Sequence, residues 1–452
     1  MAIDGCDRWT IWPNRRTCSI GVIRFVDSFS VTVRTLWDTR SHRPMTSRWS
    51  PGWPITSGRR RRSTNYPVGS SAPADLQTSH PPTTPDHNIV KITALRATPV
   101  RIPRPTAFTS SLGTHAATEN AVIEIETDSG LVGIGESSSI WDRMGVGCAD
   151  DINGLLAGLL VGRDAARIRE LTDLMDAHLD RAQPAKAGIE MALWDLLGKS
   201  VDAPVYQLLG GAVRDKVELS HSLSMGTVEQ VMEQAERLVG EGYRTLKMKV
   251  GRDPASDAAN LESLRSRYPE LKLRVDANMG WRNPKEAVRD IHDLEAFGIE
   301  MVEQPLHGSD LEGLRFVREH VEVPIMADES VWTPSDAMAC VRAGAVDVFN
   351  VYVAEAGGIG PAARIFGIAD AARLTCIIGS MPEFGIGTSA QAHLAFAMPN
   401  IGYGSDVNGF VYHQDDVVDH SLRIEDGHLL PPTGPGLGVQ LDAERLARYR
   451  MD

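Results

Sequence analysis

The chain has 452 residues, of which 42% are hydrophobic and 23% charged, a composition typical of a soluble globular protein with a large core. Its longest apolar stretch, 19–33, is interrupted by Arg24 and Asp27, which excludes a membrane-spanning helix. The net charge of −13 argues against nucleic-acid binding as the main function. The five cysteines form no CxxC pair, so the sequence indicates neither a zinc site nor a disulfide framework, and the cytoplasm is the simplest compartment.

The first 88 residues differ from the rest of the chain. They hold five of the nine tryptophans, and residues 1–90 contain 12 Arg and 6 Asp but neither Lys nor Glu. They show no sustained helical or strand period, and they include an arginine run at 59–62 and a proline-rich stretch at 81–85. We predict that residues 1–88 are mostly disordered, either as translated sequence upstream of a true start near residue 89 or as a targeting segment.

Residues 89–210 are predicted to form an α+β capping unit. Residues 90–96 alternate as a strand, and 121–126 and 131–135 flank a turn signal at 127–130, which predicts a hairpin. Residues 148–200 are helical in pattern; in 185–198, for example, apolar residues recur at helical spacing.

After Gly210 and Gly211 the pattern changes to alternating strands and helices. Short apolar strands are predicted at 217–223, 243–250, 271–276, 300–303, 323–328, 346–351 and 374–379, with a weaker eighth near 401–405. Seven or eight such units indicate a parallel barrel over 211–420, with a doubly wound sheet as the structural alternative. Residues 421–452 are predicted to leave the barrel and pack back on the capping unit.

Two lysines end the second strand of this predicted barrel. Lys247 and Lys249 are two residues apart, so their side chains share the inner face of the strand. Two ammonium groups that are close together and desolvated should lower the pKa of a lysine, which makes one of them usable as a base.

The next three strands each end in a carboxylate. These residues are Asp276, Glu303 and Asp328, separated by 27 and 25 residues, and each interval is one strand–helix repeat. Three buried carboxylates would repel one another strongly unless a cation neutralised them, and oxygen ligands favour Mg²⁺ first and Mn²⁺ second. We expect Asn278 and Glu329 to hold these ligands in place.

These motifs, taken in order, resemble the enolase superfamily, its mandelate racemase/muconate lactonizing enzyme family, and within that family the muconate cycloisomerase-like branch. The resemblance covers residues 89 to about 448 and rests on AGIEMALWD at 187–195, LLGG at 208–211, the lysine pair, Asp276-x-Asn278, EQP at 303–305, ADES at 327–330 and GGI at 357–359. It implies a capping domain over a modified TIM barrel, (β/α)₇β, with one Mg²⁺ held by the three carboxylates.

The resemblance also implies a shared reaction step, proton abstraction next to a carboxylate that is bound to the metal. Lys249 would exchange the proton. Lys247 would sit beside it, depress its pKa and touch the substrate carboxylate.

The sixth strand departs from the branch. The branch usually carries Lys five residues before the Gly-Gly pair, where this chain has Tyr352, and the mandelate-racemase branch carries Asp there with a His after strand seven, which 378–383 lacks. A racemase of this kind needs a base on each face of the carbon, and Tyr, with a pKa of about 10, is a poor base at neutral pH. We therefore favour one-face reactions, with Tyr352 either donating a hydrogen bond to substrate or filling the barrel.

Two further acidic residues are candidates for substrate binding. Glu383 is expected at the mouth beyond strand seven, either binding a cationic or hydroxyl group or beginning a helix. Asp406-x-Asn408 follows strand eight and is reminiscent of an Asp-x-Asp feature that dipeptide epimerases use for an ammonium group, with the second Asp missing. Specificity is otherwise expected in capping loops at 106–115 and 137–146, where the candidates are Ser110, Thr114, His115 and Trp141.

We therefore expect a Mg²⁺-dependent enzyme that enolises a carboxylate substrate, as an isomerase or cycloisomerase. The alternatives are a syn-dehydratase of a sugar acid or hydroxy acid, an amino-acid or dipeptide racemase, and a non-catalytic metal-binding scaffold. The intact lysine pair argues against the scaffold, because burying lysines is costly. The expected partners are a small-molecule carboxylate and further copies of the chain in a homo-oligomer, with neither nucleic acid nor membrane.

Overall fold

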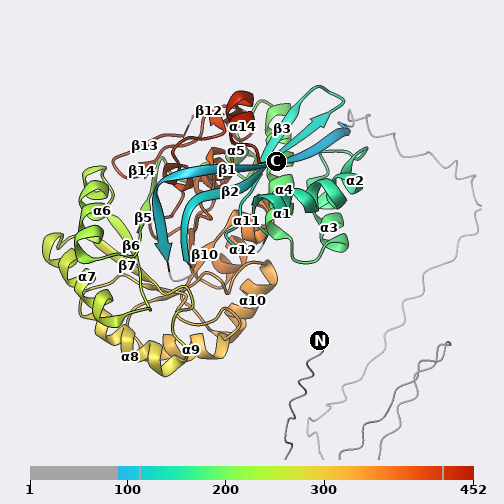
Figure 1. Cartoon of the computed structure of the whole chain (residues 1–452). Helices are drawn as coiled ribbons and strands as arrows, with labels where there is room; N and C mark the ends of the chain where they lie inside the picture. The colour runs from blue at the N-terminus through green and yellow to red at the C-terminus, as the bar shows by residue number, and fades with distance from the viewer. Residues whose placement is uncertain (1–89, 111–112, 142, 420–421, 452) are drawn as a thin grey trace, which may run out of the picture. The chain divides into compact units, whose positions relative to one another are not determined.

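The computed structural model describes residues 90–110, 113–141, 143–419 and 422–451 (Figure 1). The segment 1–88, predicted to be mostly disordered, lies outside the described residues. Among the described helices, none is both long enough and apolar enough to cross a membrane.

The capping unit begins with an antiparallel sheet in the order β1-β2-β3. Its strands are β1 (Ile92–Ser110), β2 (Gly113–Thr127) and β3 (Val132–Ser137). β1 runs much further than the predicted strand, and its pairing with β2 shifts register between Pro103 and Phe108, where Pro103 and Pro105 have no N–H to donate. The expected capping loop at 106–115 is therefore largely strand on both sides of residues 111 and 112.

Helix α4 (Gln183–Ser200) packs closely on β3. A Cβ atom on Gly135 of β3 would lie only 1.9 Å from the carbonyl oxygen of Gly188 in α4, so the approach requires glycine. The other helices of this unit are α1 (Gly145–Asp151), a π-helical turn (Ile152–Leu156), α2 (Ala157–Leu160), α3 (Ile168–His178) and α5 (Val205–Leu208).

A seven-stranded parallel sheet forms the second unit, in the order β11-β10-β9-β8-β7-β6-β5. Its strands are β5 (Ser220–Leu223), β6 (Thr245–Lys249), β7 (Lys272–Asp276), β8 (Val302–Glu303), β9 (Ile325–Ala327), β10 (Val348–Val351) and β11 (Thr375–Ile378). The weak eighth strand consists of isolated bridges: Ile401 pairs with Cys376, and Ser405 pairs with Leu219. These bridges connect the two edges of the sheet, and the predicted modified TIM barrel is confirmed.

Helices follow one another around the outside of the strands, as Figure 1 shows for α6 to α10. They are α6 (Val228–Gly240), α7 (Pro254–Arg267), α8 (Pro284–Glu295), α9 (Leu311–His320), α10 (Pro334–Ala343), α11 (Val353–Ala356), α12 (Ile359–Ala371) and α13 (Gly385–Ala397). Local sequence sets where many of them begin. Thr227 and Thr333 each form a reciprocal capping box, and the side chains of Asp253, Asn283 and Asp310 accept hydrogen bonds from first-turn N–H groups.

The C-terminal segment contacts both units. It contains a 3₁₀ turn (Gly409–Tyr412), β12 (Val418–Asp419), β13 (Ile424–Glu425), β14 (His428–Leu429), β15 (Gln440–Leu441) and α14 (Ala443–Tyr449). β14 pairs with β4 (Val217–Glu218) beside the barrel, while Arg450 bridges to Val100 of the capping sheet. A single hydrophobic cluster also extends from Ile102 and Ile134 into the barrel. The two units therefore share a core.

Candidate active site

Three carboxylates lie where neighbouring barrel strands end. In the parallel register Lys249 pairs with Asp276, and Asp276 pairs with Glu303, while Asp328 directly follows β9. One oxygen atom from each of the three carboxylates lies within 4.8 Å of the others, and all three side chains are buried. The carboxyl ends of the strands thus bring together the three residues that the sequence placed one repeat apart.

The chemistry of this cluster fits a divalent cation. Burial and the charge of Asp276 raise the pKa of Glu303, and burial with the neighbouring carboxylates raises the pKa of Asp328 well above its usual range. Such a cluster holds either protons or a cation, because buried like charges repel strongly. Three carboxylate oxygens in this arrangement suit Mg²⁺ or Mn²⁺, which prefer hard oxygen ligands.

The two lysines face the carboxylates, and this corrects one expectation. Lys247 Nζ donates to Asp406 Oδ2 at 2.6 Å and to Glu303 Oε2 at 3.0 Å. Burial acts to lower the pKa of Lys247, but the surrounding carboxylates outweigh it and hold the pKa well above the ordinary value. The prediction that a paired, desolvated lysine would have a lowered pKa is therefore wrong for Lys247, because acids rather than the second ammonium group dominate its surroundings.

Lys249 lies at the edge of the carboxylate cluster. Its Nζ donates to Asp276 Oδ2 at 2.5 Å and to Asn278 Oδ1 at 3.0 Å. Asn278 in turn donates through Nδ2 to Glu329 Oε1 at 3.2 Å, and its backbone N–H donates to Asp276 Oδ1 at 2.8 Å. Its φ of 42° is a left-handed value that asparagine tolerates well. Asn278 therefore contacts Asp276, one of the three carboxylates that we expected it to hold, whereas Glu329 bonds Asn278 and reaches the carboxylates only through it.

Tyr352 reaches the same cluster from strand β10. Its hydroxyl donates to Asp328 Oδ2 at 2.9 Å and accepts from Asn350 Nδ2 at 3.2 Å. Burial and the nearby carboxylates raise the pKa of Tyr352 well above its usual value, so the phenol stays protonated and acts as a donor. Asn350 Nδ2 also lies 2.9 Å from Glu303 Oε1.

Asp406 and Glu383, the two acidic candidates for substrate binding, have different surroundings. Asp406 lines the cavity at the barrel mouth, but its carboxylate is engaged by Lys247 and by the Ser220 hydroxyl. Glu383 is not among the residues that line this cavity; it is buried and accepts hydrogen bonds from the Ser380 hydroxyl at 2.7 Å and from the Met381 N–H at 3.1 Å. Glu383 therefore positions Ser380, which does line the cavity, and the expectation that it faces substrate is corrected.

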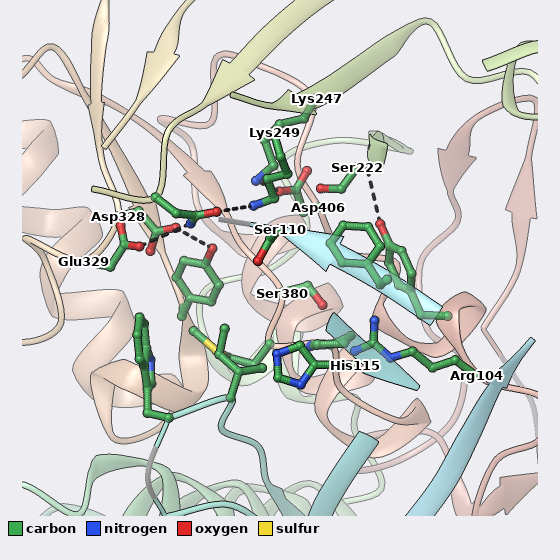
Figure 2. Close-up of a pocket in the computed structure, with 18 residues that line it drawn as sticks. Arg104, Ser110, His115, Ser222, Lys247, Lys249, Asp328, Glu329, Ser380 and Asp406 are labelled. Carbon is green, nitrogen blue, oxygen red and sulfur yellow. Dashed lines mark hydrogen bonds and ion pairs between the residues drawn. The ribbon is translucent and has the colours of Figure 1, made fainter. Parts of the chain in front are cut away.

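Figure 2 shows the side chains that line one cavity between the barrel mouth and the capping hairpin, among them Lys247, Lys249, Asp328, Glu329, Ser380 and Asp406. The space between these side chains, with the open solvent at the mouth included, is about 780 Å³. Among the capping-unit candidates, Ser110, His115 and Trp141 line it, whereas Thr114 bonds Thr109 on the exposed hairpin. Further residues line the cavity without having been predicted from the sequence: Arg104, Phe108, Ser222, Ser380 and Tyr412.

Two further residues support the site without a role predicted from the sequence, Gln304 of the EQP motif and Asn350. Gln304 Oε1 accepts from the Asp328 N–H at 2.8 Å and holds the loop after β9. Asn350 joins Glu303 to Tyr352. The signal for Asn350 was available, because a polar residue inside an apolar strand, two positions before Tyr352, shares its face.

Two family models match the chain. Residues 91–210 match the N-terminal domain of the mandelate racemase / muconate lactonizing enzyme family, and residues 230–445 match the enolase C-terminal domain-like family. Together they span both the capping unit and the barrel.

Curated relatives and solved structures agree with these matches. The chain is 35% identical over 357 residues to L-Ala-D/L-Glu epimerase of Bacillus subtilis (strain 168), which covers 77% of this chain and 97% of that protein. It is 32% identical over 371 residues to chloromuconate cycloisomerase of Pseudomonas putida, with coverage of 80% and 99%. The structure of muconate lactonizing enzyme from Pseudomonas fluorescens complexed with muconolactone matches with a TM-score of 0.78 and 29% identity, covering 80% of this chain and all of that one.

Proposed function

Because the chain is an enzyme of the mandelate racemase/muconate lactonizing enzyme family in the enolase superfamily, we propose that it enolises a carboxylate substrate with the help of Mg²⁺, as an isomerase or cycloisomerase. One observation carries the proposal: the amine of Lys249 bonds Asp276 of the carboxylate cluster, and Lys249 lines the same cavity as Asp328 of that cluster. A cation site beside a base is the arrangement that removal of a proton next to a carboxylate requires.

Each group has a distinct task in this mechanism. The three carboxylates would hold Mg²⁺ (or Mn²⁺), which supplies positive charge to a substrate carboxylate and to the negative charge that develops when the neighbouring proton leaves. Lys249 takes that proton at Nζ, and Asp276 and Asn278 aim the amine. Lys247, kept charged by its carboxylate partners, adds positive charge on the same side.

Tyr352 favours a reaction on one face of the substrate. Its raised pKa keeps it from accepting a proton at neutral pH, and its hydroxyl already donates to Asp328. Cycloisomerisation needs only Lys249, and so does syn-dehydration of a hydroxy acid or sugar acid, which remains the lyase alternative. Formation of a keto acid, detected with a carbonyl reagent, would identify the dehydratase.

A racemase or epimerase is the second candidate because relatives with those names match the chain. The site does not favour a dipeptide with an ammonium group, because the two side chains that would bind that group already have partners. Asp406 pairs with Lys247, and Asn408 donates to the backbone carbonyl of Ser220. Entry of solvent deuterium at the carbon next to the carboxylate with inversion would identify this activity.

Proton exchange in D₂O tests the proposal. The full chain with Mg²⁺ is incubated with a library of carboxylic acids, and exchange next to the carboxylate is followed by NMR. We expect exchange that Lys249→Ala abolishes and that chelation of the metal with EDTA also abolishes. Lys272→Ala is the matched control, because Lys272 begins β7 at the opposite end of the barrel and pairs with Glu218. Exchange that persists in Lys249→Ala would contradict the assignment of the base.

A further inference from the structure

Arg104 is a cation inside the cavity with no role in the proposed reaction. It lies on β1 of the capping unit and is only 8% exposed, yet it lines the cavity. Its Nε donates to Thr118 Oγ1 at 3.2 Å, and its guanidinium carbon lies 5.8 Å from the centre of the Phe108 ring. One edge of the guanidinium is thus fixed by the capping sheet.

Among the residues that the structure describes, no carboxylate pairs with Arg104. Burial lowers the pKa of Arg104, and the one described group that opposes this shift is the Tyr412 phenol. The neighbouring groups are themselves uncharged at neutral pH, because burial raises the pKa of Tyr412 and lowers that of His413 to about 3. A desolvated guanidinium without a counter-charge is costly, so such a group is usually completed by an anion.

The position of Arg104 shows where that anion would be. Figure 2 shows Asp328 and Glu329 on one side of the cavity and Arg104 on the other, with Ser110 and Ser380 between them. A ligand that has one carboxylate at the cation site therefore extends across the cavity towards the guanidinium. Lys249, Asp328 and Arg104 line one continuous cavity, so a single ligand can contact groups at both of its ends.

We propose that the substrate carries a second anionic group, a carboxylate at the end remote from the reacting carbon, and that Arg104 binds it. The planar guanidinium presents paired N–H groups that match a carboxylate, which makes Arg104 a specificity-determining residue. This inference rests on the proposed function, since the first carboxylate is the one assigned to the cation site. It narrows the substrate class from carboxylates to dianions.

Calorimetric titration of the Mg²⁺-loaded full chain tests this assignment. The probes are succinate, glutarate and adipate, each paired with the monoacid of equal chain length: butyrate, valerate and hexanoate. We expect at least one diacid to bind about 10- to 100-fold more tightly than its monoacid, the range of a charge-assisted pair. Arg104→Gln should remove this preference and leave the monoacid affinity unchanged, and Arg104→Lys should restore part of it. An ω-phosphono acid of each length shows whether a phosphate-like end is preferred.

The matched control is Arg101→Gln. Arg101 lies three residues earlier on β1, is exposed and pairs with Glu119, so its loss should leave the preference intact. Equal affinity of diacid and monoacid in the unaltered protein would overturn the inference, and so would an equal loss of both in Arg104→Gln, which indicates a structural role.

Repeating the titrations with EDTA separates the two proposals. If the acids bind only with Mg²⁺ and diacids bind no more tightly than monoacids, the role of Arg104 is contradicted and the proposed function is still supported. If the diacid preference is the same with Mg²⁺ and with EDTA, the role of Arg104 is supported but the proposed function is contradicted. Absence of binding by every acid contradicts both.

Discussion

At the scale of single residues, Tyr352 distinguishes this site from the branch that its sequence resembles. The lysine expected at this position would add a cation facing the substrate, whereas the phenol donates to Asp328 and accepts from Asn350. The hydroxyl thereby fixes one of the three carboxylates. In the proposed mechanism this hydrogen bond positions a ligand of the cation, a role that is testable apart from catalysis.

Tyr352→Phe should weaken Mg²⁺ binding by about 10-fold, because a lost hydrogen bond to a metal ligand typically costs that much affinity. The ring remains, so the packing in the barrel is unchanged. Calorimetric titration with Mg²⁺ measures the effect. Tyr412→Phe is the matched control, since Tyr412 lines the same cavity but accepts from the Ser222 N–H, away from the carboxylates. Unchanged Mg²⁺ affinity in Tyr352→Phe would place the role of the phenol on the substrate instead.

At the scale of elements, β3 packs closely on α4 within the capping unit and also contacts helix α13 of the barrel. Gly135 and Gly188 bring the strand and helix together, and the next residue, Glu136, accepts hydrogen bonds from the N–H groups of Phe384 and Gly387 at the start of α13. The buried Glu136 therefore links the capping sheet to a barrel helix.

Gly135→Ala should lower the free energy of unfolding by about 3 kcal/mol, because the added methyl group meets backbone atoms of α4 that have no free space to move into. Urea denaturation measures the change. Gly367→Ala serves as control: Gly367 lies in α12, with nothing within 4 Å of the added Cβ, so we expect a gain of up to about 1 kcal/mol from helix propensity. Equal stability of Gly135→Ala and the parent would disprove the close packing.

At the scale of the whole molecule, buried acids make stability depend on pH. Burial raises the pKa to about 7 for five carboxyl groups: Glu136, Glu190, Glu329, Glu383 and Asp416. In the unfolded chain these carboxyl groups have pKa values of about 4, so between that pH and about 7 the folded protein binds more protons than the unfolded chain. The folded protein therefore loses stability as the pH rises through this range. Burial lowers the pKa values of three histidines to between about 3 and 4: His221, His393 and His413. These histidines make stability rise with pH, but only below about pH 6.5, where the unfolded chain would bind their protons.

The melting temperature of the metal-free protein should therefore fall between pH 6.5 and pH 8, where the carboxyl groups act alone. Mg²⁺ should offset this fall, because its ligands bind it only when ionised, and its stabilisation grows with pH. Thermal denaturation in EDTA and in excess Mg²⁺ at several pH values measures both effects. A melting temperature that rises with pH in EDTA would show that these carboxyl groups are already ionised in the folded chain.

The sequence by itself determined the barrel and the identity of the carboxylate cluster. Both follow from periodicity: apolar strands alternate with helices, and one acid ends each of three successive strands. The carboxyl ends of parallel strands meet at one mouth, so residues one repeat apart must converge there. The long capping hairpin was harder to predict, because two prolines conceal a strand that continues across a register shift.

Only the tertiary structure decided how the individual side chains are paired. It surrounds Lys247 with acids, turns Glu383 towards Ser380, and leaves Arg104 facing the cavity without a described carboxylate partner. Charge and pKa depend on the nearest few ångströms, and those neighbours come from elements far apart in the chain. Sequence spacing fixes which strand end a residue occupies. The packing of the capping unit on the barrel fixes what that residue touches.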